Sequence, residues 1–341
     1  MRVLPAVDLI RNRRAFRNRL RSWFRASGRD LPWRGTRDAY AILVSEIMLQ
    51  QTQVVTVLPY YTRWLERFPD FRTLAQASES EVLHAWQGLG YYARARNLHA
   101  AAKAVVARGS FPDGVEEMRK LPGLGRYTAN AIATFAFGKS VPVVEANTAR
   151  LLARLTNQQL PIDSAAGRER LWDLAAALIP PHDASEFNSA LMDLGATICV
   201  ARQPKCLACP VRNFCRATDP ANLPIKKPRA ATKRLFERHA FIFEAGQILL
   251  EQSGDRWRGM WILPRLASAP TKPRIYEAQF PFTNHLITLA VHPDHVPQSR
   301  VHRWFDLDFI KSIPMPSPHR RALDYLLMHE PQKLCSTSAT P

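Results

Sequence analysis

The chain has 341 residues, more than one average domain, and its composition (46% hydrophobic, 22% charged) is that of a globular protein with an ample core. No apolar run approaches the roughly 18 residues that a membrane span needs, so the sequence predicts no membrane association. The 47 Lys and Arg residues outnumber the 29 Asp and Glu residues, which gives a formal net charge of +18. An excess of this size favours a polyanionic partner such as nucleic acid over the alternative of a merely basic protein.

The positive charge is concentrated in residues 1–37, which hold eleven arginines and two aspartates. An arginine-rich and acid-poor start is also typical of organelle transit peptides. The apolar residues of this segment nevertheless recur at helical spacing, at Phe16, Leu20, Trp23 and Phe24. We therefore interpret the segment as an amphipathic helix that belongs to the fold, and we see no secretory signal.

Up to about residue 215, apolar residues recur every three or four positions, which predicts helices nearly throughout. Three prolines and seven basic residues in residues 216–238 indicate a linker. Beyond it the apolar period becomes two: a hairpin turning at Gly246 is predicted over 241–252 and a further strand over 282–292. A short helix is predicted over 319–327. The expected organisation is a helical domain over 1–215, a linker over 216–238 and a smaller mixed α/β domain over 239–341.

Four of the five cysteines fall in one stretch, CVARQPKCLACPVRNFC (199–215), with the spacing C-x6-C-x2-C-x5-C: Cys199, Cys206, Cys209 and Cys215. Disulfides are not expected for a single cluster in a chain without a secretory signal. Four thiolates in a compact loop are typical of a 4Fe–4S cluster, and a structural zinc ion, which usually binds two close pairs, is the alternative. Cys335 stands apart and is interpreted as incidental. The loop also carries basic residues that a rigid metal core would hold towards phosphates, namely Arg202, Lys205 and Arg212.

The stretch LPGLGRYTANAIATFAFG (121–138) places Gly123 and Gly125 on either side of a leucine, ahead of a helical run. Glycines permit close approach of the backbone, and the free N–H groups at the start of the helix favour a phosphate. A G-x-G pair alone is weak evidence, because many tight turns share it.

Two glutamates are candidates for acid–base chemistry. In AYAILVSEIMLQQTQV (39–54), Glu46 lies beside a predicted apolar stripe, where a carboxyl tends to stay protonated as a general acid requires. The alternative is a glutamate on a helix surface. In VVEANTAR (143–150), we expect Asn147 to cap a helix. Glu145 is then either a catalytic carboxylate at the helix N-terminus or a first-turn acid that complements the helix dipole.

These segments resemble a known family. LPGLGRYTA and the cysteine spacing are similar to the helix-hairpin-helix and the iron–sulfur loop of the endonuclease III superfamily of DNA glycosylases. SEIMLQQTQV (45–54) resembles the active-site helix of the adenine DNA glycosylases of the MutY type. The blocks LPWR (31–34), GLGYYARARNLH (88–99) and FNSALMDLGATIC (187–199) resemble segments of that family in the same order. The resemblance implies a mainly α fold: a helix-hairpin-helix glycosylase domain with an iron–sulfur cluster loop, followed by a smaller α/β domain similar to Nudix hydrolases.

The activity implied by this resemblance is that of a monofunctional glycosylase, which flips out adenine mispaired with 8-oxoguanine or guanine and hydrolyses its glycosidic bond to initiate base excision repair. Glu46 would donate a proton to adenine N7. Glu145, which stands where the family has an aspartate, would stabilise the positively charged sugar, with Asn147 beside it. Tyr127 occupies the position of the lysine nucleophile of lyase members and cannot form a Schiff base.

The resemblance also implies residues that bind DNA or the base. Tyr91 would enter the duplex as a wedge, with Gln51 and Thr52 next to the vacated space. Trp33 and Arg34 would line the adenine pocket, and the glycines of the hairpin would contact phosphates. In the second domain, Asn284 and His285 stand in the place of the loop that reads 8-oxoguanine, and no Nudix pyrophosphatase motif follows Trp261. These roles are implied for Trp33, Arg34, Gln51, Thr52, Tyr91, Gly123, Gly125, Asn284 and His285.

The implied cofactor is one 4Fe–4S cluster on Cys199, Cys206, Cys209 and Cys215. The implied partner is double-stranded DNA containing A:8-oxoguanine or A:G mispairs, bound by a monomer of bacterial type in the cytoplasm, at the nucleoid. Two alternatives remain. One is a glycosylase for oxidised pyrimidines, as endonuclease III is, against which Tyr127 and the second domain argue. The other is a non-catalytic iron–sulfur protein that binds damaged DNA, against which the retention of Glu46, Tyr127 and Asn147 argues.

Overall fold

The computed structural model describes residues 5–228, 230–297 and 299–329, and it divides the chain into two compact units. Unit 1 comprises Met1–Gln51 and Ala104–Pro228, and unit 2 comprises Thr52–Lys103 and Arg229–Pro341. Cys335 lies outside the described residues. In the described part of the chain, none of the helices is both long and apolar enough to cross a membrane.

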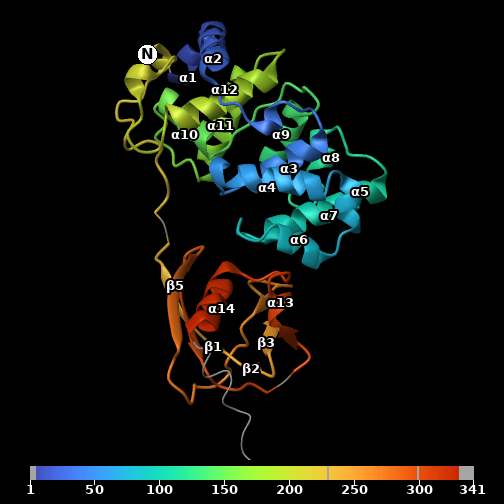
Figure 1. The fold of residues 1–341 in the computed structure, drawn as a ribbon. Helices are drawn as coiled ribbons and strands as arrows, with labels where there is room; N and C mark the ends of the chain where they lie inside the picture. The colour runs from blue at the N-terminus through green and yellow to red at the C-terminus, as the bar shows by residue number, and fades with distance from the viewer. Residues whose placement is uncertain (1–4, 229, 298, 330–341) are drawn as a thin grey trace, which may run out of the picture. The chain divides into compact units, whose positions relative to one another are not determined.

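Unit 1 is helical, as the apolar periodicity predicts (Figure 1). Its α-helices are α1 (Pro5–Arg11), α2 (Arg13–Ser27), α3 (Ala39–Leu49), α8 (Val115–Met118), α9 (Arg126–Phe135), α10 (Ala146–Leu155), α11 (Ala165–Leu178) and α12 (Ala184–Thr197). Short 3-10 turns are η1 (Pro32–Arg34), η2 (Cys206–Ala208) and η3 (Arg212–Phe214).

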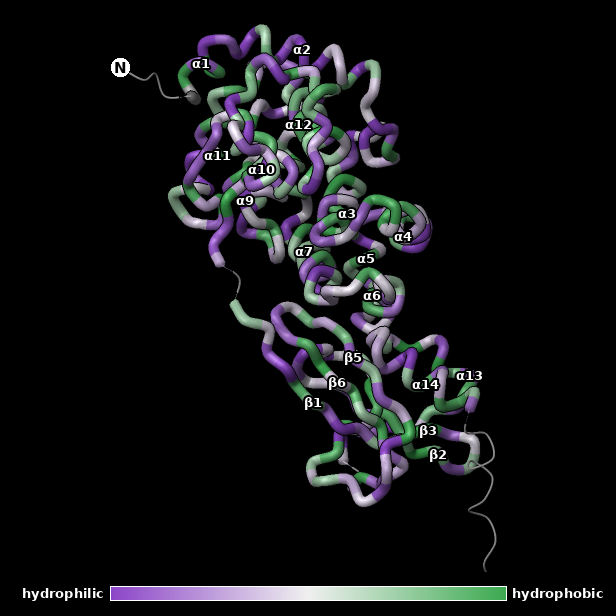
Figure 2. The backbone as a smooth tube through the Cα atoms, turned by 90° about the vertical axis from the view of Figure 1, so that its left-hand side faces the viewer, coloured by the Kyte–Doolittle hydropathy of each residue, from purple (hydrophilic) through white to green (hydrophobic). Residues whose placement is uncertain are grey.

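The helix α3 is buried on nearly all sides, from Tyr40 to Met48. The hydropathy colouring of Figure 2 reflects this, because α3 is mostly green whereas α2 carries much purple. Asp38 begins α3 by accepting a hydrogen bond from the backbone N–H of Tyr40 at 2.9 Å. A rigid helix with a buried surface all round fixes the one carboxylate that it carries, Glu46.

Several of the N-terminal arginines stabilise the fold rather than offer free charge. Phe16 and Leu20 bury one side of α2, as predicted. Arg17 donates to the last carbonyls of α11, at Leu178 and Ile179 (2.7 Å each). Arg21 and Arg25, also on α2, bind Glu186 of α12. Arg29 and Arg34, which follow α2 in the chain, bind Asp193 of α12. Part of the positive charge of this segment is therefore neutralised by acidic residues within unit 1.

Unit 2 combines helices with two small sheets. Its helices are α4 (Val54–Arg67), α5 (Phe71–Gln76), α6 (Glu79–Ala85), the first part of α7 (Ala93–Arg108), α13 (Leu307–Ile310) and α14 (Ser317–His329). Its strands are β1 (Lys233–Ala240), β2 (Phe243–Glu244), β3 (Gln247–Gln252), β4 (Trp261–Ile262), β5 (Tyr276–Phe282), β6 (His285–His292) and β7 (His302–Asp306). One sheet has the order β1-β6-β5, with β1 and β6 parallel, and the other joins β2, β3 and β4, with β7 also paired to β3.

The strand predictions hold in part. The hairpin over 241–252 is confirmed as β2 and β3, with Gly246 in the turn at φ +80°. The strand predicted over 282–292 is wrong at its start, because Thr283 (φ +54°) turns the chain between β5 and β6. The helix predicted over 319–327 is part of the longer α14.

The linker predicted over 216–238 ends earlier than expected, since β1 already begins at Lys233 and pairs with β6. The domain boundaries at 215 and 239 remain a prediction. The compact units follow packing rather than the order of the sequence, and α4, α5 and α6 belong to the same unit as the strands.

Candidate active site

A hydrogen bond joins Glu46, a candidate for acid–base chemistry, to Tyr127, which stands in the position of the lyase lysine. Glu46 lies in the interior of α3 with 3% of its surface exposed. Tyr127, in the first turn of α9, donates its hydroxyl to Oε2 of Glu46 at 2.6 Å. Because Oε2 is the acceptor, a proton on this carboxyl belongs on Oε1, where it can be donated to a substrate.

The surroundings of Glu46 favour its protonated form. Burial, with a smaller contribution from the charge of Glu145, raises the pKa of Glu46 to about 7, against the opposing effects of the hydrogen bond from Tyr127 and the charge of Arg34. Burial, together with the carboxyls of Glu46 and Glu145, also raises the pKa of Tyr127 well above its usual value. Tyr127 therefore keeps its proton and acts as a donor, and Glu46 has the pKa of a general acid at neutral pH.

Glu145 caps the helix α10. Its Oε2 accepts from the backbone N–H of Asn147 at 2.6 Å, and its Oε1 accepts from that of Thr148 at 2.7 Å. The prediction that Asn147 caps this helix is wrong, since α10 already begins at Ala146. The longer glutamate side chain reaches both N–H groups from a residue with extended backbone, which leaves Asn147 inside the first turn.

The carboxylate of Glu145 is held half-buried at a helix N-terminus. Burial raises its pKa, while the N–H groups of Asn147 and Thr148 act in the opposite direction. Its charge acts on both Glu46 and Tyr127, so these three side chains lie within electrostatic reach of one another. Glu46 lies inside an apolar helix, whereas Glu145 accepts hydrogen bonds at a helix N-terminus. Because their environments differ, the two carboxyls can differ in protonation at the same pH.

Asn147 links the start of α10 to α12. Its Oδ1 accepts from Nη2 of Arg150 at 2.8 Å, and Arg150 also donates to the carbonyls of Gly195 (2.7 Å) and Cys199 (2.9 Å). A Cβ atom on Gly195 would lie 2.7 Å from the carbonyl oxygen of Asn147, so only glycine permits this approach of the two helices. These contacts fix the side chain beside Glu145.

Trp33 and Arg34 lie on the short turn η1, and Trp33 is buried. The guanidinium of Arg34 is engaged with Asp193, at 2.7 and 2.9 Å, and its charge also acts on Glu46. Burial opposes ionisation of Asp193, but the hydrogen bonds from Arg34 and Arg29 outweigh it and lower the pKa of Asp193. Sequence reasoning missed Asp193, although a single acid within the apolar run ALMDLGA was a visible signal.

The hairpin that precedes α9 contains the two glycines predicted to contact phosphates. Gly123 has φ +79°, and Gly125 is the N-cap residue of α9 with extended backbone. A Cβ atom added at Gly125 would meet nothing within 4 Å, so the backbone there is open to a close ligand. The first exposed side chain of α9, Arg126, binds Glu169 at 2.9 Å and stacks over Trp172.

The predicted wedge, Tyr91, and the residues predicted beside the vacated space, Gln51 and Thr52, lie in turns. Gln51 is exposed and has φ +58°, and Thr52 follows it. Tyr91 has φ +48° and is 46% exposed, which is unusual for a large aromatic side chain. Thr52 and Tyr91 belong to unit 2, and the contacts between them run through Arg94, which donates to Thr52 Oγ1 at 3.0 Å.

Asn284 and His285 lie at the turn between β5 and β6. Asn284 is exposed, His285 begins β6, and the carbonyl of Asn284 accepts from the backbone N–H of Lys233 at 2.9 Å. The pair is accessible from solvent and is rigidly connected to the sheet. The role of Asn284 and His285 in recognising the opposite base remains a prediction.

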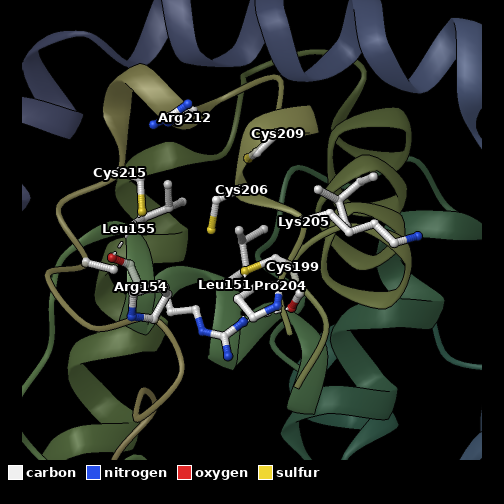
Figure 3. Close-up of a pocket in the computed structure, with 13 residues that line it drawn as sticks. Leu151, Arg154, Leu155, Cys199, Pro204, Lys205, Cys206, Cys209, Arg212 and Cys215 are labelled. Atoms are coloured by element: carbon white, nitrogen blue, oxygen red, sulfur yellow. Dashed lines mark hydrogen bonds between the residues drawn. The ribbon is translucent and has the colours of Figure 1, made fainter. Parts of the chain in front are cut away.

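The four cysteines line one cavity of about 260 Å³ in unit 1, formed by the loop over 199–215 and by α10 (Figure 3). A buried guanidinium faces this cavity: Nη1 of Arg154 donates to Cys199 Sγ at 3.3 Å and to the carbonyl of Val200 at 2.7 Å. In the described part of the chain, no three His, Cys, Asp or Glu side chains converge closely enough to hold a single metal ion. The residues present fit a larger anionic group with thiolate ligands, because four thiols surround a cavity and a buried cation compensates their charge.

Comparison with known proteins identifies relatives. Residues 44–174 match the family model described as HhH-GPD superfamily base excision DNA repair protein. The human adenine DNA glycosylase is 46% identical over 214 residues, which are 60% of this chain and 39% of the human protein. The adenine DNA glycosylase of Mycolicibacterium smegmatis is 45% identical over 201 residues, 58% of this chain and 67% of that protein. The chain thus matches only about two fifths of the length of the human relative.

A solved structure supports the same fold. A thermostable thymine-DNA glycosylase superposes with a TM-score of 0.56 at 32% sequence identity, and the match covers 60% of this chain and 96% of that one. The helix-hairpin-helix glycosylase fold expected from the sequence is therefore confirmed, and the strands of unit 2 form the expected additional α/β part.

Proposed function

This chain belongs to the adenine DNA glycosylase family, within the HhH-GPD superfamily of base excision DNA repair proteins, and we propose that it removes adenine from A:8-oxoguanine and A:G mispairs in double-stranded DNA. The observation that carries the proposal is the bond from Tyr127 to a buried Glu46 whose pKa is about 7, within electrostatic reach of Glu145. The protein would act as a monomer in the bacterial cytoplasm, at the nucleoid.

The first chemical step is protonation of the base. Adenine is a poor leaving group until a ring nitrogen carries a proton, and Oε1 of Glu46 supplies it to N7. Tyr127 holds the opposite oxygen of the carboxyl and thereby fixes the direction of the proton donor. After donation, the bond from Tyr127 stabilises the carboxylate that forms, because it favours the charged state.

The second step is stabilisation of the sugar. Departure of adenine leaves an oxocarbenium-like ring, and the carboxylate of Glu145 compensates its positive charge. The two backbone N–H groups that hold Glu145 pre-organise the carboxylate, so that it need not reorient during the reaction. Asn147, fixed by Arg150, orients the carboxylate or the attacking water.

The target base must leave the helical stack before either step. Tyr91 is the wedge that fills the vacated space, with Gln51 and Thr52 beside it, and Trp33 lines the adenine pocket while Arg34 supports it. The open backbone at Gly125, together with the exposed Gly123, binds phosphates at the start of α9. Asn284 and His285 distinguish 8-oxoguanine from guanine on the opposite strand.

We further propose that Cys199, Cys206, Cys209 and Cys215 hold one 4Fe–4S cluster. The cavity between the thiols and the guanidinium of Arg154 supports a cluster over a single zinc ion, which needs no such space. When bound, the cluster supplies a rigid anionic scaffold. The chain's own Arg202, Lys205 and Arg212, all exposed on this loop, then face the DNA backbone.

Single-turnover cleavage of three duplexes tests the proposed function, with A opposite 8-oxoguanine, A opposite guanine, and thymine glycol as the target. We expect release of adenine from the first two, leaving an abasic strand that breaks only after alkali. Borohydride should trap no covalent adduct, because Tyr127 offers no amine. Cleavage of thymine glycol, or efficient trapping, would move the protein to the endonuclease III class, and binding without cleavage would indicate the non-catalytic alternative.

A further inference from the structure

The loop that carries Tyr91 has a strained backbone. It joins α6 to α7, and Gly88, Gly90 and Tyr91 have φ of +104°, +71° and +48°. A tyrosine in this region of backbone conformation persists only when its surroundings hold it there. A residue that holds this loop therefore sets the position of Tyr91.

One buried side chain provides that support. Arg94 is 7% exposed, and its Nη2 donates to the carbonyls of Leu89 (2.9 Å) and Gly90 (3.1 Å) and to Oγ1 of Thr52 (3.0 Å). Trp86 adds a second bond to the carbonyl of Gly90, at 3.0 Å. A single guanidinium thus joins Thr52 to the loop before α7, within unit 2.

The same guanidinium also contacts the ring of the wedge residue. Its carbon lies 5.6 Å from the centroid of the Tyr91 ring and 5.3 Å from that of Trp86, within the range of cation–π attraction. Burial lowers the pKa of Arg94 to about 10, so the side chain remains charged at neutral pH. The backbone and the ring of Tyr91 are therefore held by one cation.

Helix stability does not account for an arginine at this position. Arg94 is the second residue of α7, where the helix dipole is unfavourable for a cation and where acids are preferred. Burial of its charge is a further cost that the hydrogen bonds must offset. The position is explained if the contacts with the loop serve the reaction.

We propose that Arg94 is a positioning residue, which holds Tyr91 and Thr52 in the arrangement needed to enter the duplex and extrude the base. The proposal rests on the proposed function, in which Tyr91 is the wedge. Arg94 touches no reacting atom and acts through Tyr91. A change at Arg94 should therefore slow base extrusion without changing the chemistry at Glu46.

The test compares Arg94→Gln with Arg96→Gln in the full-length protein. Arg96 lies on the same helix and donates to the carbonyl of Arg258, with no bond to the loop. Extrusion is followed with 2-aminopurine at the target position, whose fluorescence rises when it leaves the stack. A fluorine at C2′ of its sugar prevents cleavage, because it disfavours positive charge at the anomeric carbon. Single-turnover release of adenine is measured in parallel.

We expect Arg94→Gln to slow both the fluorescence rise and adenine release by about 10- to 100-fold, and Arg96→Gln to match the parent. In a Tyr91→Ala background, Arg94→Gln should cost less than about threefold, because the two residues act as one unit. Arg94→Lys keeps the charge without the planar guanidinium, so its rates of extrusion and adenine release should fall between those of the parent and of Arg94→Gln. It takes the place of Arg94→Gln in the test if the glutamine variant does not fold.

Two results would overturn the assignment of Arg94. One is equal behaviour of Arg94→Gln and Arg96→Gln, and the other is an equal loss from Arg94→Gln with and without Tyr91. If the parent protein neither releases adenine nor brightens the 2-aminopurine duplex, the proposed function itself fails, and the role of Arg94 fails with it. Failure of the proposed function is distinguishable from failure of the role of Arg94, because only the former is seen with the parent protein alone.

Discussion

Tyr127 and Glu46 form a donor–acceptor pair of 2.6 Å in which the tyrosine both directs the proton of the carboxyl and limits its pKa. The hydrogen bond favours the carboxylate, whereas burial favours the acid, and burial wins. The pair therefore sets the pH range in which Glu46 acts as a general acid.

Removal of the tyrosine hydroxyl should shift the pH dependence. In Tyr127→Phe the bond that lowers the pKa of Glu46 is lost, so we expect the alkaline limb of the single-turnover rate to move from about 7 to higher pH. Tyr276→Phe, in β5 of unit 2, is the matched control and should keep the parental profile. An alkaline limb that moves to lower pH, or not at all, would show that the bond does not tune Glu46.

The raised pKa of Glu46 also predicts how stability depends on pH. The folded state binds its proton up to about pH 7, while an unfolded glutamate loses it near 4.5. Stability from this group is fully present below pH 4.5 and is lost as the pH rises through 7, by an amount on the order of 3 kcal/mol. Glu46→Gln should remove this loss. Denaturant unfolding of both proteins at pH 5 and pH 8 measures it, and an equal decline in both would contradict the assigned pKa.

Periodicity in the sequence was sufficient for the local features. It predicted α2 with Phe16 and Leu20 inside, α3 as a helix with an apolar stripe, and the hairpin at Gly246, because each depends on neighbours in the chain. The burial of α3 on nearly all sides depends on distant segments and was not predicted. The position of Glu46 beside that stripe predicted a carboxyl that stays protonated, with a glutamate on the helix surface as the alternative, and the raised pKa agrees with the first of these.

Long-range contacts could not be predicted in this way. The bond from Tyr127 to Glu46 spans 81 residues of the sequence. Asp193 binds Arg34 and Arg29, which lie 159 and 164 residues away in the sequence. The short β7 and the strand β5, which contains Pro281, carry too weak a pattern to be recognised. The cap of α10 was assigned to Asn147 because asparagine is the commoner capping residue, while the structure uses the longer Glu145.

The cysteine loop predicts a measurable cofactor. Protein prepared without oxygen should be brown, with broad absorption near about 400 nm from thiolate-to-iron charge transfer, and should contain iron. Cys206→Ser should lose this absorption and bind duplex DNA more weakly, while Cys335→Ser, outside the loop, should keep both. Stoichiometric zinc without iron would show that the cavity holds a different metal.

Recognition of the opposite base is expected at the turn between β5 and β6. The double variant Asn284→Ala/His285→Ala should narrow the rate difference between A:8-oxoguanine and A:G duplexes and spare the A:G rate itself, since Glu46 and Glu145 lie elsewhere in the chain. Gln279→Ala/Thr288→Ala removes a bonded pair from the same two strands and serves as the control. Full retention of the preference in the first variant would exclude these residues as the reader.

The central claim is that Glu145 is catalytic although it also caps α10. Its two bonds to backbone N–H groups could belong to a purely structural cap, and rate measurements separate the two roles. Glu145→Asp keeps a good capping residue but withdraws the carboxylate by about one C–C bond, so it should fold normally and react clearly more slowly.

Glu145→Gln tests the claim most directly, since it keeps the length of the side chain and removes the charge. Single-turnover release of adenine opposite 8-oxoguanine should be abolished, and duplex affinity should remain close to that of the parent, because only the developing positive charge of the sugar loses its partner. Release at the parental rate by Glu145→Gln would contradict the account and leave Glu145 as a helix cap alone.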